Sequence, residues 1–325
     1  MDIDRRSLHQ SARASLASAT GTPKQVVLIY AAVSSLLALA ATLVSLLLSD
    51  RIADTGGLSN LGLRSVLATI QYILPFVQVL VMMAMDLGYQ KAMLNITRGR
   101  PAGNQNLTHG FYLFWPLLRA TVMQYVIYMG VIFISIYAAS FIFSFLPMSQ
   151  KFRDTMAPYL SGELVMDQAA AIQAIPAMIP LLITCIVVCC AFLLPKIYQF
   201  RMVNYCLLDS DRPGAIMALG QSRAMMYGNR MKLFRLDLDF WWFYALQILI
   251  TLVCYGDILL PMLGITFPWS ATVSYFLFYI LSLLLQVSVY YLFMNRVHVT
   301  YAAFYEAVRP RPQENGAVLG NIFDM

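Results

Sequence analysis

Six long runs of apolar residues, separated by shorter polar segments, dominate the chain. They lie at residues 26–48, 66–85, 120–146, 175–194, 240–260 and 270–294. The first run has 23 residues. As a helix rising about 1.5 Å per residue it extends roughly 34 Å, enough to cross a hydrocarbon core of about 30 Å. The pattern therefore predicts an all-α fold, a polytopic membrane bundle of about six transmembrane helices with short cytoplasmic interfacial helices.

The composition favours the same class of fold. Hydrophobic residues make up 60% of the 325 residues and charged residues 12%, against about 45–50% and about 25% in a typical soluble domain. A soluble fold of this length has too few polar side chains to cover so much apolar surface. The net charge of +6 does not indicate nucleic acid as a partner, because the basic residues recur between the apolar runs instead of forming one patch.

The distribution of basic residues predicts the orientation. With the N-terminus inside, the inner segments carry 18 Lys and Arg residues and the outer segments carry 4. This asymmetry follows the positive-inside rule and places both termini in the cytoplasm. We therefore expect three parts: a cytoplasmic N-terminal segment (1–25), a six-helix transmembrane domain (26–308) and a cytoplasmic C-terminal tail (309–325).

Residues 1–25 allow two interpretations. Leu8, Ala12 and Leu16 fall four apart, so they share one face of an expected interfacial helix with a basic side. The other interpretation is a disordered polar tail.

The predicted spans contain few groups that could carry chemistry. Their main polar side chains are glutamines, which more often join helices than line a pathway: Gln71, Gln78, Gln124, Gln247 and Gln286. No Asp, Glu or His is central in a predicted span, which disfavours a proton-driven carrier. Prolines in the spans fit either a moving transporter or an ordinary bundle.

Neither a metal nor a cofactor is expected. Cys185 and Cys189 are one helical turn apart, but no His lies near them and the three histidines are scattered. Nucleotide-binding, hydrolase and zinc-protease motifs are missing from the sequence. We therefore predict no catalytic, cofactor-binding or metal-ligating residues.

The cytoplasmic segment 195–239 is the richest in polar residues. Asp209, Ser210 or Asp211 is suited to cap a short helix from Ala215 to Met226. Gly228 marks a bend, because glycine accepts backbone angles that other residues resist. Beyond it, Arg230 to Asp239 is expected to run without a break into the fifth span.

This segment also supplies the candidate site residues. They combine carboxylates, basic groups, one hydroxyl and the bend glycine: Asp209, Asp211, Arg212, Ser222, Arg223, Gly228, Lys232, Asp237 and Asp239. Two carboxylates can perform acid–base chemistry or hold a cation. However, Asp237 and Asp239 lie on different faces of a helix, so local pairing, such as Arg235 with Asp239, is the simpler interpretation. The basic groups are placed to meet anionic lipid headgroups.

Four stretches resemble a bacterial integral membrane family known as domain of unknown function nine hundred seventy-five. They are Ser11–Leu16, Leu87–Tyr89 with Arg98–Gly99 and His109–Phe111, Ala218–Phe240, and Tyr301–Glu306. The resemblance covers nearly the whole chain and implies a protein of the bacterial cytoplasmic membrane. Asp239 departs from it, because the family usually has Ser there.

Three functions remain open. The first is a non-enzymatic envelope protein that acts through lipids or unknown protein partners. The second is a small transporter or export-permease component, and the third is the membrane subunit of a lipid-directed enzyme. The lack of central charged residues in the predicted spans disfavours the transporter, and the lack of catalytic motifs disfavours the enzyme, so the first function is favoured.

Overall fold

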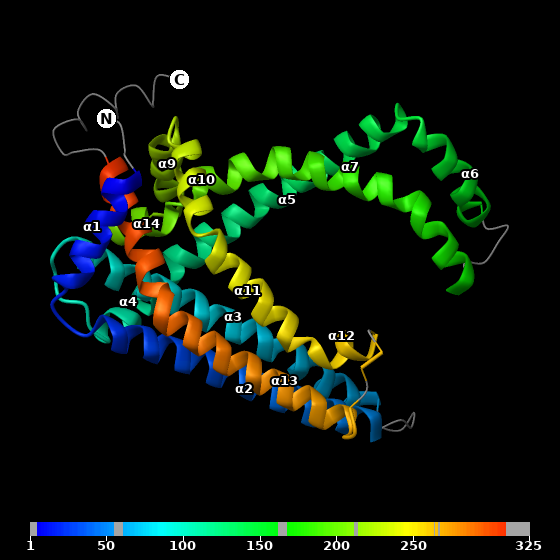
Figure 1. The fold of residues 1–325 in the computed structure, drawn as a ribbon, viewed down its shortest axis with the longest axis horizontal. Coiled ribbons are helices and arrows are strands. Elements are labelled where there is room, and N and C mark those ends of the chain that lie inside the picture. The colour runs from blue at the N-terminus through cyan, green and yellow to red at the C-terminus, as the bar shows by residue number, and fades with distance from the viewer. Residues whose placement is uncertain are drawn as a thin grey trace. The chain divides into compact units, whose positions relative to one another are not determined.

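The computed structural model describes residues 5–54, 61–161, 168–210, 214–262, 264–265 and 267–309 (Figure 1). Within these ranges the regular elements are helices, and β pairing is limited to one isolated bridge between Gly21 and Ala102. The all-α fold class predicted from the sequence is confirmed.

The helices follow one another in this order: α1 (Arg5–Ala17), α2 (Pro23–Asp54), α3 (Leu61–Thr97), α4 (Gln105–Tyr112), α5 (Phe114–Ser144), α6 (Met148–Leu160), α7 (Gln168–Phe200), α8 (Val203–Asp209), α9 (Ala215–Met226), α10 (Arg230–Asp239), α11 (Trp241–Cys254), α12 (Gly256–Met262), α13 (Ala271–Val289), the π-helical turn η2 (Tyr290–Met294) and α14 (Asn295–Val308).

The predicted number of spans agrees with the described helices. Five stretches are long and apolar enough to cross a membrane: Pro23–Leu48, Ser65–Thr97, Phe114–Ser144, Met178–Asp209 and Thr272–Val308. The bent pair α10 and α11 makes a sixth if it counts as one span. Large apolar side chains on these helices point outward, as Leu36 (64% exposed) and Phe76 (63% exposed) illustrate. Such surfaces suit contact with lipid.

The second span extends further than the sequence predicted. The apolar run ends at residue 85, but α3 continues to Thr97 and includes Asp86. The helix continues because Tyr89, Met93 and Ile96 are buried at helical spacing. An apolar run ends at the first charged residue, whereas the helix continues past that residue because its next turns are packed against other helices.

The expected unbroken helix from Arg230 into the fifth span is wrong. Helices α10 and α11 meet at Phe240 with a bend of 61°. The Phe240 backbone lies at φ −106° and ψ 16°, outside the α region, and its side chain is 1% exposed. Burial of this ring and the long-range contacts of Asp237 and Asp239 hold the end of α10 in place.

The structure divides into two compact units, each described by itself. Unit 1 comprises the described residues of Met1–Leu117, Asn204–Gly214 and Met231–Met325, and unit 2 those of Leu118–Val203 and Ala215–Arg230.

The long helices α2, α3 and α13 lie side by side in unit 1 (Figure 1). Helix α4 packs directly on α3 through glycine. A side chain at Gly88 would collide with the Leu107 carbonyl oxygen, and one at Gly110 with that of Ala84. These two glycines, which also carry the family resemblance, therefore set how closely the helices approach.

The helix considered for residues 1–25 is present as α1. Its Leu8 and Ala12 are buried, 6% and 1% exposed, and α1 lies against α14 and α3. The face predicted from the spacing of these residues is thus covered by protein.

Unit 2 contains most of α5 together with α6, α7 and α9. Helix α9 has the predicted bounds, and Met225 and Met226 are buried, whereas Met217 is 47% exposed. The hydroxyl of Ser222 donates a hydrogen bond to the Gln199 carbonyl oxygen at 3.0 Å, which fixes α9 on α7.

Candidate functional site

The nine residues singled out in the cytoplasmic segment do not form one cluster. Ser222 is buried against α7, and Arg223 is exposed on α9. Gly228 takes a positive φ of 77°, which confirms the predicted bend. Lys232 is half-buried on α10. Asp211 and Arg212 lie outside the described residues.

Asp209 takes part in an ion-pair network that joins α3, α8 and α14. Its carboxylate lies 2.9 Å from Nη2 of Arg98 and 2.7 Å from Nη2 of Arg309. Nε of Arg98 donates a hydrogen bond to Glu306 at 2.7 Å, and the Tyr305 hydroxyl donates one to Asp209 at 3.1 Å. We call Arg98, Asp209, Tyr305, Glu306 and Arg309 the ion-pair network.

The ion-pair network is electrically balanced, with two arginines and two carboxylates. Burial disfavours the charged Arg98 guanidinium, but its hydrogen bond with Glu306 and the charges of Glu306 and Asp209 outweigh burial and raise the pKa of Arg98. Because the charges satisfy one another, the network is suited to hold helices together.

Asp237 faces the last helix. The Tyr301 hydroxyl donates a hydrogen bond to its carboxylate at 2.6 Å, and the hydroxyls of Tyr301 and Tyr244 lie 2.8 Å apart. Asp237 and Asp239 therefore have different partners, as their spacing predicted.

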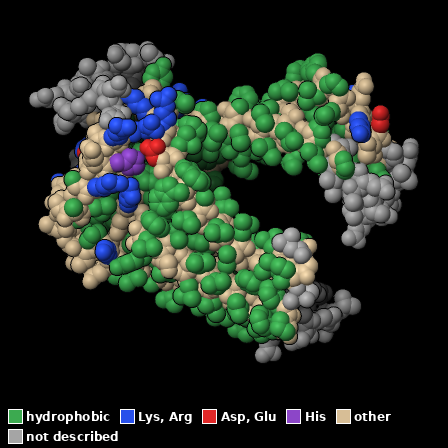
Figure 2. Space-filling model, in the orientation of Figure 1, with side chains coloured by type: hydrophobic (Ala, Val, Ile, Leu, Met, Phe, Trp, Pro, Cys, Tyr) green, Lys and Arg blue, Asp and Glu red, His purple; other side chains and the backbone are tan. Residues whose placement is uncertain are grey.

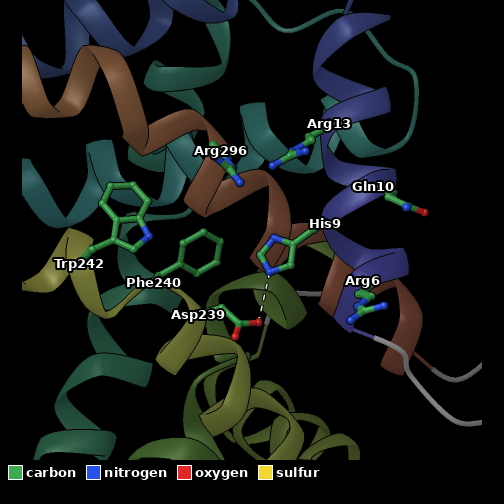
Figure 3. A pocket seen from close by; sticks show the side chains of 8 residues that line it. All are labelled: Arg6, His9, Gln10, Arg13, Asp239, Phe240, Trp242 and Arg296. Carbon is green, nitrogen blue, oxygen red and sulfur yellow. Dashed lines mark hydrogen bonds and ion pairs between the residues drawn. The ribbon is translucent and has the colours of Figure 1, made fainter.

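Asp239 opens onto a cavity of about 310 Å³ (Figure 3). Its walls come from α1, the α10–α11 corner and α14, and its lining residues are Arg6, His9, Gln10, Arg13, Asp239, Phe240, Trp242 and Arg296. We call this cavity the basic pocket. Figure 2 shows Lys and Arg side chains gathered near His and acidic groups on this face of the molecule.

Two contacts position the carboxylate of Asp239. Nη1 of Arg5 lies 3.1 Å from Oδ1, and Nε2 of His9 lies 3.3 Å from Oδ2. The His9 ring packs edge-on against Phe240 with centroids 5.4 Å apart. Arg235, the partner expected from the sequence, is not among the ion-pair partners of Asp239 in the described part of the chain.

The charge of the basic pocket is unbalanced. Three arginines and one aspartate line it, and two of the arginines, Arg13 and Arg296, have no ion-pair partner among the described residues. Arg13 of α1 and Arg296 of α14 extend toward one another across the space in Figure 3. Nδ1 of His9 and Nε of Arg296 are buried without a hydrogen-bond partner among the described residues. The Arg296 N–H remains to be satisfied by an acceptor, whereas Nδ1 of His9 donates or accepts according to its tautomer.

The basic pocket has the chemistry of an anion site. Arginine presents several N–H donors in a planar fork that matches phosphate oxygens. Trp242 adds an amphipathic ring of the type found at membrane interfaces. Among the described lining residues there is no Ser, Thr, Cys or Lys to act as a nucleophile.

Sequence reasoning named Asp239 but missed most of the residues around it. Arg13 belongs to a stretch of the family resemblance, which was a usable signal. His9 and Arg296 carried none, because their contacts join segments far apart, such as His9 and Asp239 at a separation of 230 residues.

Comparison with known proteins gives a family and no further relative. The family model described as "Protein of unknown function (DUF975)" matches residues 1–312. None of the curated proteins and none of the solved structures matches the chain.

Proposed function

Since the chain belongs to the family of proteins of unknown function DUF975, we propose a function from its own geometry: its basic pocket binds the phosphate of an anionic lipid headgroup. The protein is a non-enzymatic, multi-pass protein of the bacterial cytoplasmic membrane with both termini in the cytoplasm. It acts through lipids or protein partners.

The observation that carries this proposal is the excess of arginine in the basic pocket. Arg13 and Arg296 line a space with one carboxylate and have no ion-pair partner among the described residues, and Nε of Arg296 is a buried donor without a hydrogen-bond partner there. A phosphodiester would supply both the missing negative charge and the missing acceptors.

The position of the pocket along the chain supports a lipid as the source of the phosphate. The pocket lies where α11 begins with two tryptophans and where α14 continues the last apolar stretch. In the proposed orientation this is the cytoplasmic interface, where anionic headgroups meet basic side chains. Long arginine side chains reach this level while their stems cover apolar surface.

The direct test is lipid binding by the whole protein. The protein in phosphatidylcholine nanodiscs would be titrated with phosphatidylglycerol, and bound lipid measured by native mass spectrometry. We expect Arg13→Gln combined with Arg296→Gln to weaken binding at least about tenfold, since each charge-assisted hydrogen bond contributes about 1.5–3 kcal/mol.

The matched control is Arg100→Gln combined with Arg223→Gln. It removes the same charge from two exposed arginines outside the pocket. Equal losses in both double variants would reduce the effect to diffuse attraction and reject the pocket. Inorganic phosphate competing as well as the lipid would point to a soluble anion instead.

A further inference from the structure

A second polar region runs through the apolar part of unit 1. On α3 the side chains of Gln71, Pro75, Gln78, Asp86 and Tyr89 fall within roughly 80° of one another, at about 100° per residue. They therefore share one face of the helix, on which the apolar Met82 also falls between Gln78 and Asp86, and the rest of the helix surface is largely apolar.

Helix α13 and the turn η2 carry a matching stripe. Tyr275, Tyr279, Gln286 and Tyr290 fall within roughly 60° by the same rule. Thr42 of α2 donates a hydrogen bond to the Tyr279 hydroxyl at 2.9 Å, and Nε2 of Gln286 donates one to the Tyr290 hydroxyl at 3.1 Å. We call the two stripes and the α2 residues that meet them the polar seam.

One end of the polar seam is a cavity of about 360 Å³. Its polar lining comes from three helices: Thr42, Ser45, Gln71, Gln78 and Tyr275. Pro75 also lines it and has no N–H to donate, so the Gln71 carbonyl oxygen loses its helical partner there. The side-chain amides of Gln71 and Gln78 make no hydrogen bond to a described residue. At membrane depth such groups persist where they line a cavity that holds water.

The other end of the polar seam is the carboxyl group of Asp86. The Tyr30 hydroxyl donates a hydrogen bond to Oδ1. No Lys, Arg or His of the described residues lies within ion-pair distance of it. An aspartate in a membrane span without a counter-ion is costly and marks a functional position.

The titratable groups that interact directly with Asp86 are Tyr30 and Tyr290. Tyr30 of α2 packs its ring 5.3 Å from Tyr89 and 6.2 Å from Tyr290, and His298 of α14 packs edge-on against Tyr89 at 5.1 Å. On the α4 side, burial and the charge of Lys91 lower the pKa of His109.

The helix geometry beside Asp86 is also unusual. Tyr290 opens the π-helical turn η2, a form that occurs mostly as single turns at functional sites. The Tyr89 hydroxyl donates a hydrogen bond to Asn295 at 2.8 Å, and Asn295 donates one to the Pro23 carbonyl oxygen at 3.1 Å. These bonds close the polar seam beyond Asp86.

We propose that the polar seam is a hydrated half-channel through which Asp86 exchanges a proton with water in the cavity. The proposal rests on the membrane placement above and is independent of the basic pocket.

The exchange needs no co-reactant. A hydronium ion in the cavity transfers its proton to a carboxylate oxygen of Asp86 through intervening water, leaving neutral water behind. The charged carboxylate accepts the Tyr30 hydrogen bond, and the protonated carboxyl can use its own O–H as a donor to the Tyr30 oxygen. Release reverses these steps.

The test is infrared difference spectroscopy of the whole protein in phosphatidylcholine nanodiscs. Between acid and alkaline buffer we expect a protonated-carboxyl C=O band that Asp86→Asn removes and Asp86→Glu restores at a shifted frequency. After transfer to deuterium oxide, exchange of the carboxyl proton shifts this band to lower frequency. In the double variant Gln71→Leu, Gln78→Leu we expect this exchange to be at least about tenfold slower than in the unmodified protein.

The control for access is Gln124→Leu, which removes a glutamine of α5 outside the cavity. If no band depends on Asp86, the proposal is wrong. If the double glutamine variant and the Gln124→Leu control exchange deuterium at the same rate, the proton does not reach Asp86 through the cavity. A band that responds to sodium in place of potassium at constant pH would make Asp86 a cation site and reject the proton. The lipid titration above can fail without affecting any of these readouts, so the two proposals are distinguishable.

Discussion

The ion-pair network and the basic pocket use the same residue types in unit 1 and differ in their balance. The network sets two arginines against two carboxylates, whereas the pocket sets three arginines against one. In the network every charge has an ion-pair partner within 2.9 Å. Both contain a buried arginine N–H without a hydrogen-bond partner among the described residues, but Nη2 of Arg98 lies against two carboxylates, whereas Arg296 has no ion-pair partner among those residues. A balanced cluster is therefore expected to contribute stability, and an unbalanced one to bind a ligand.

Removal of Arg98 should have the largest effect on stability. Arg98→Met leaves the carboxylates of Asp209 and Glu306 without their shared partner, and removing one member of such a network costs about 3 kcal/mol. We expect the thermal unfolding midpoint and the folded yield, both measured in detergent, to fall strongly. Arg223→Met, on an exposed arginine of α9, is the control and should change little.

Neutralising the carboxylate of the basic pocket should strengthen lipid binding. Asp239→Asn removes the one negative charge among the lining residues, so phosphatidylglycerol should bind about fivefold more tightly, roughly 1 kcal/mol. Asp237→Asn removes the same charge two residues away, outside the lining. If both variants changed the affinity equally, the balance of charge within the pocket would not decide binding.

Removal of one neutral hydrogen-bond donor from the network should have the smallest effect. Tyr305→Phe deletes the hydroxyl that donates to Asp209 but keeps both arginines in place. The expected loss is about 0.5–1 kcal/mol in the free energy of unfolding, with lipid affinity unchanged. A loss as large as that of Arg98→Met would show that the hydrogen bond, and not the balance of charge, holds the network together.

Much of the helical organisation followed from local pattern. The helix Ala215–Met226 and the bend at Gly228 were predicted from capping residues, composition and a single glycine. The Gly88 and Gly110 stretches were visible as motifs, but their meaning as the contact between α3 and α4 was not.

The errors arose where packing overrides hydropathy. The apolar run that ends at residue 85 excluded Asp86 from the second span, although α3 continues through it to Thr97. The bend at Phe240 broke a segment without proline or glycine, because burial of the ring and the contacts of Asp237 and Asp239 hold that corner.

The sequence by itself determined the all-α class, the approximate number and extent of the apolar helices, and the asymmetry of basic residues between them. These properties depend on neighbours within a few turns of helix, and hydrophobic period and length report them directly. Only the tertiary structure decided which charges neutralise one another and which remain for a ligand. Arg98 meets Glu306 across 208 positions and His9 meets Asp239 across 230, and no local period carries information over such separations.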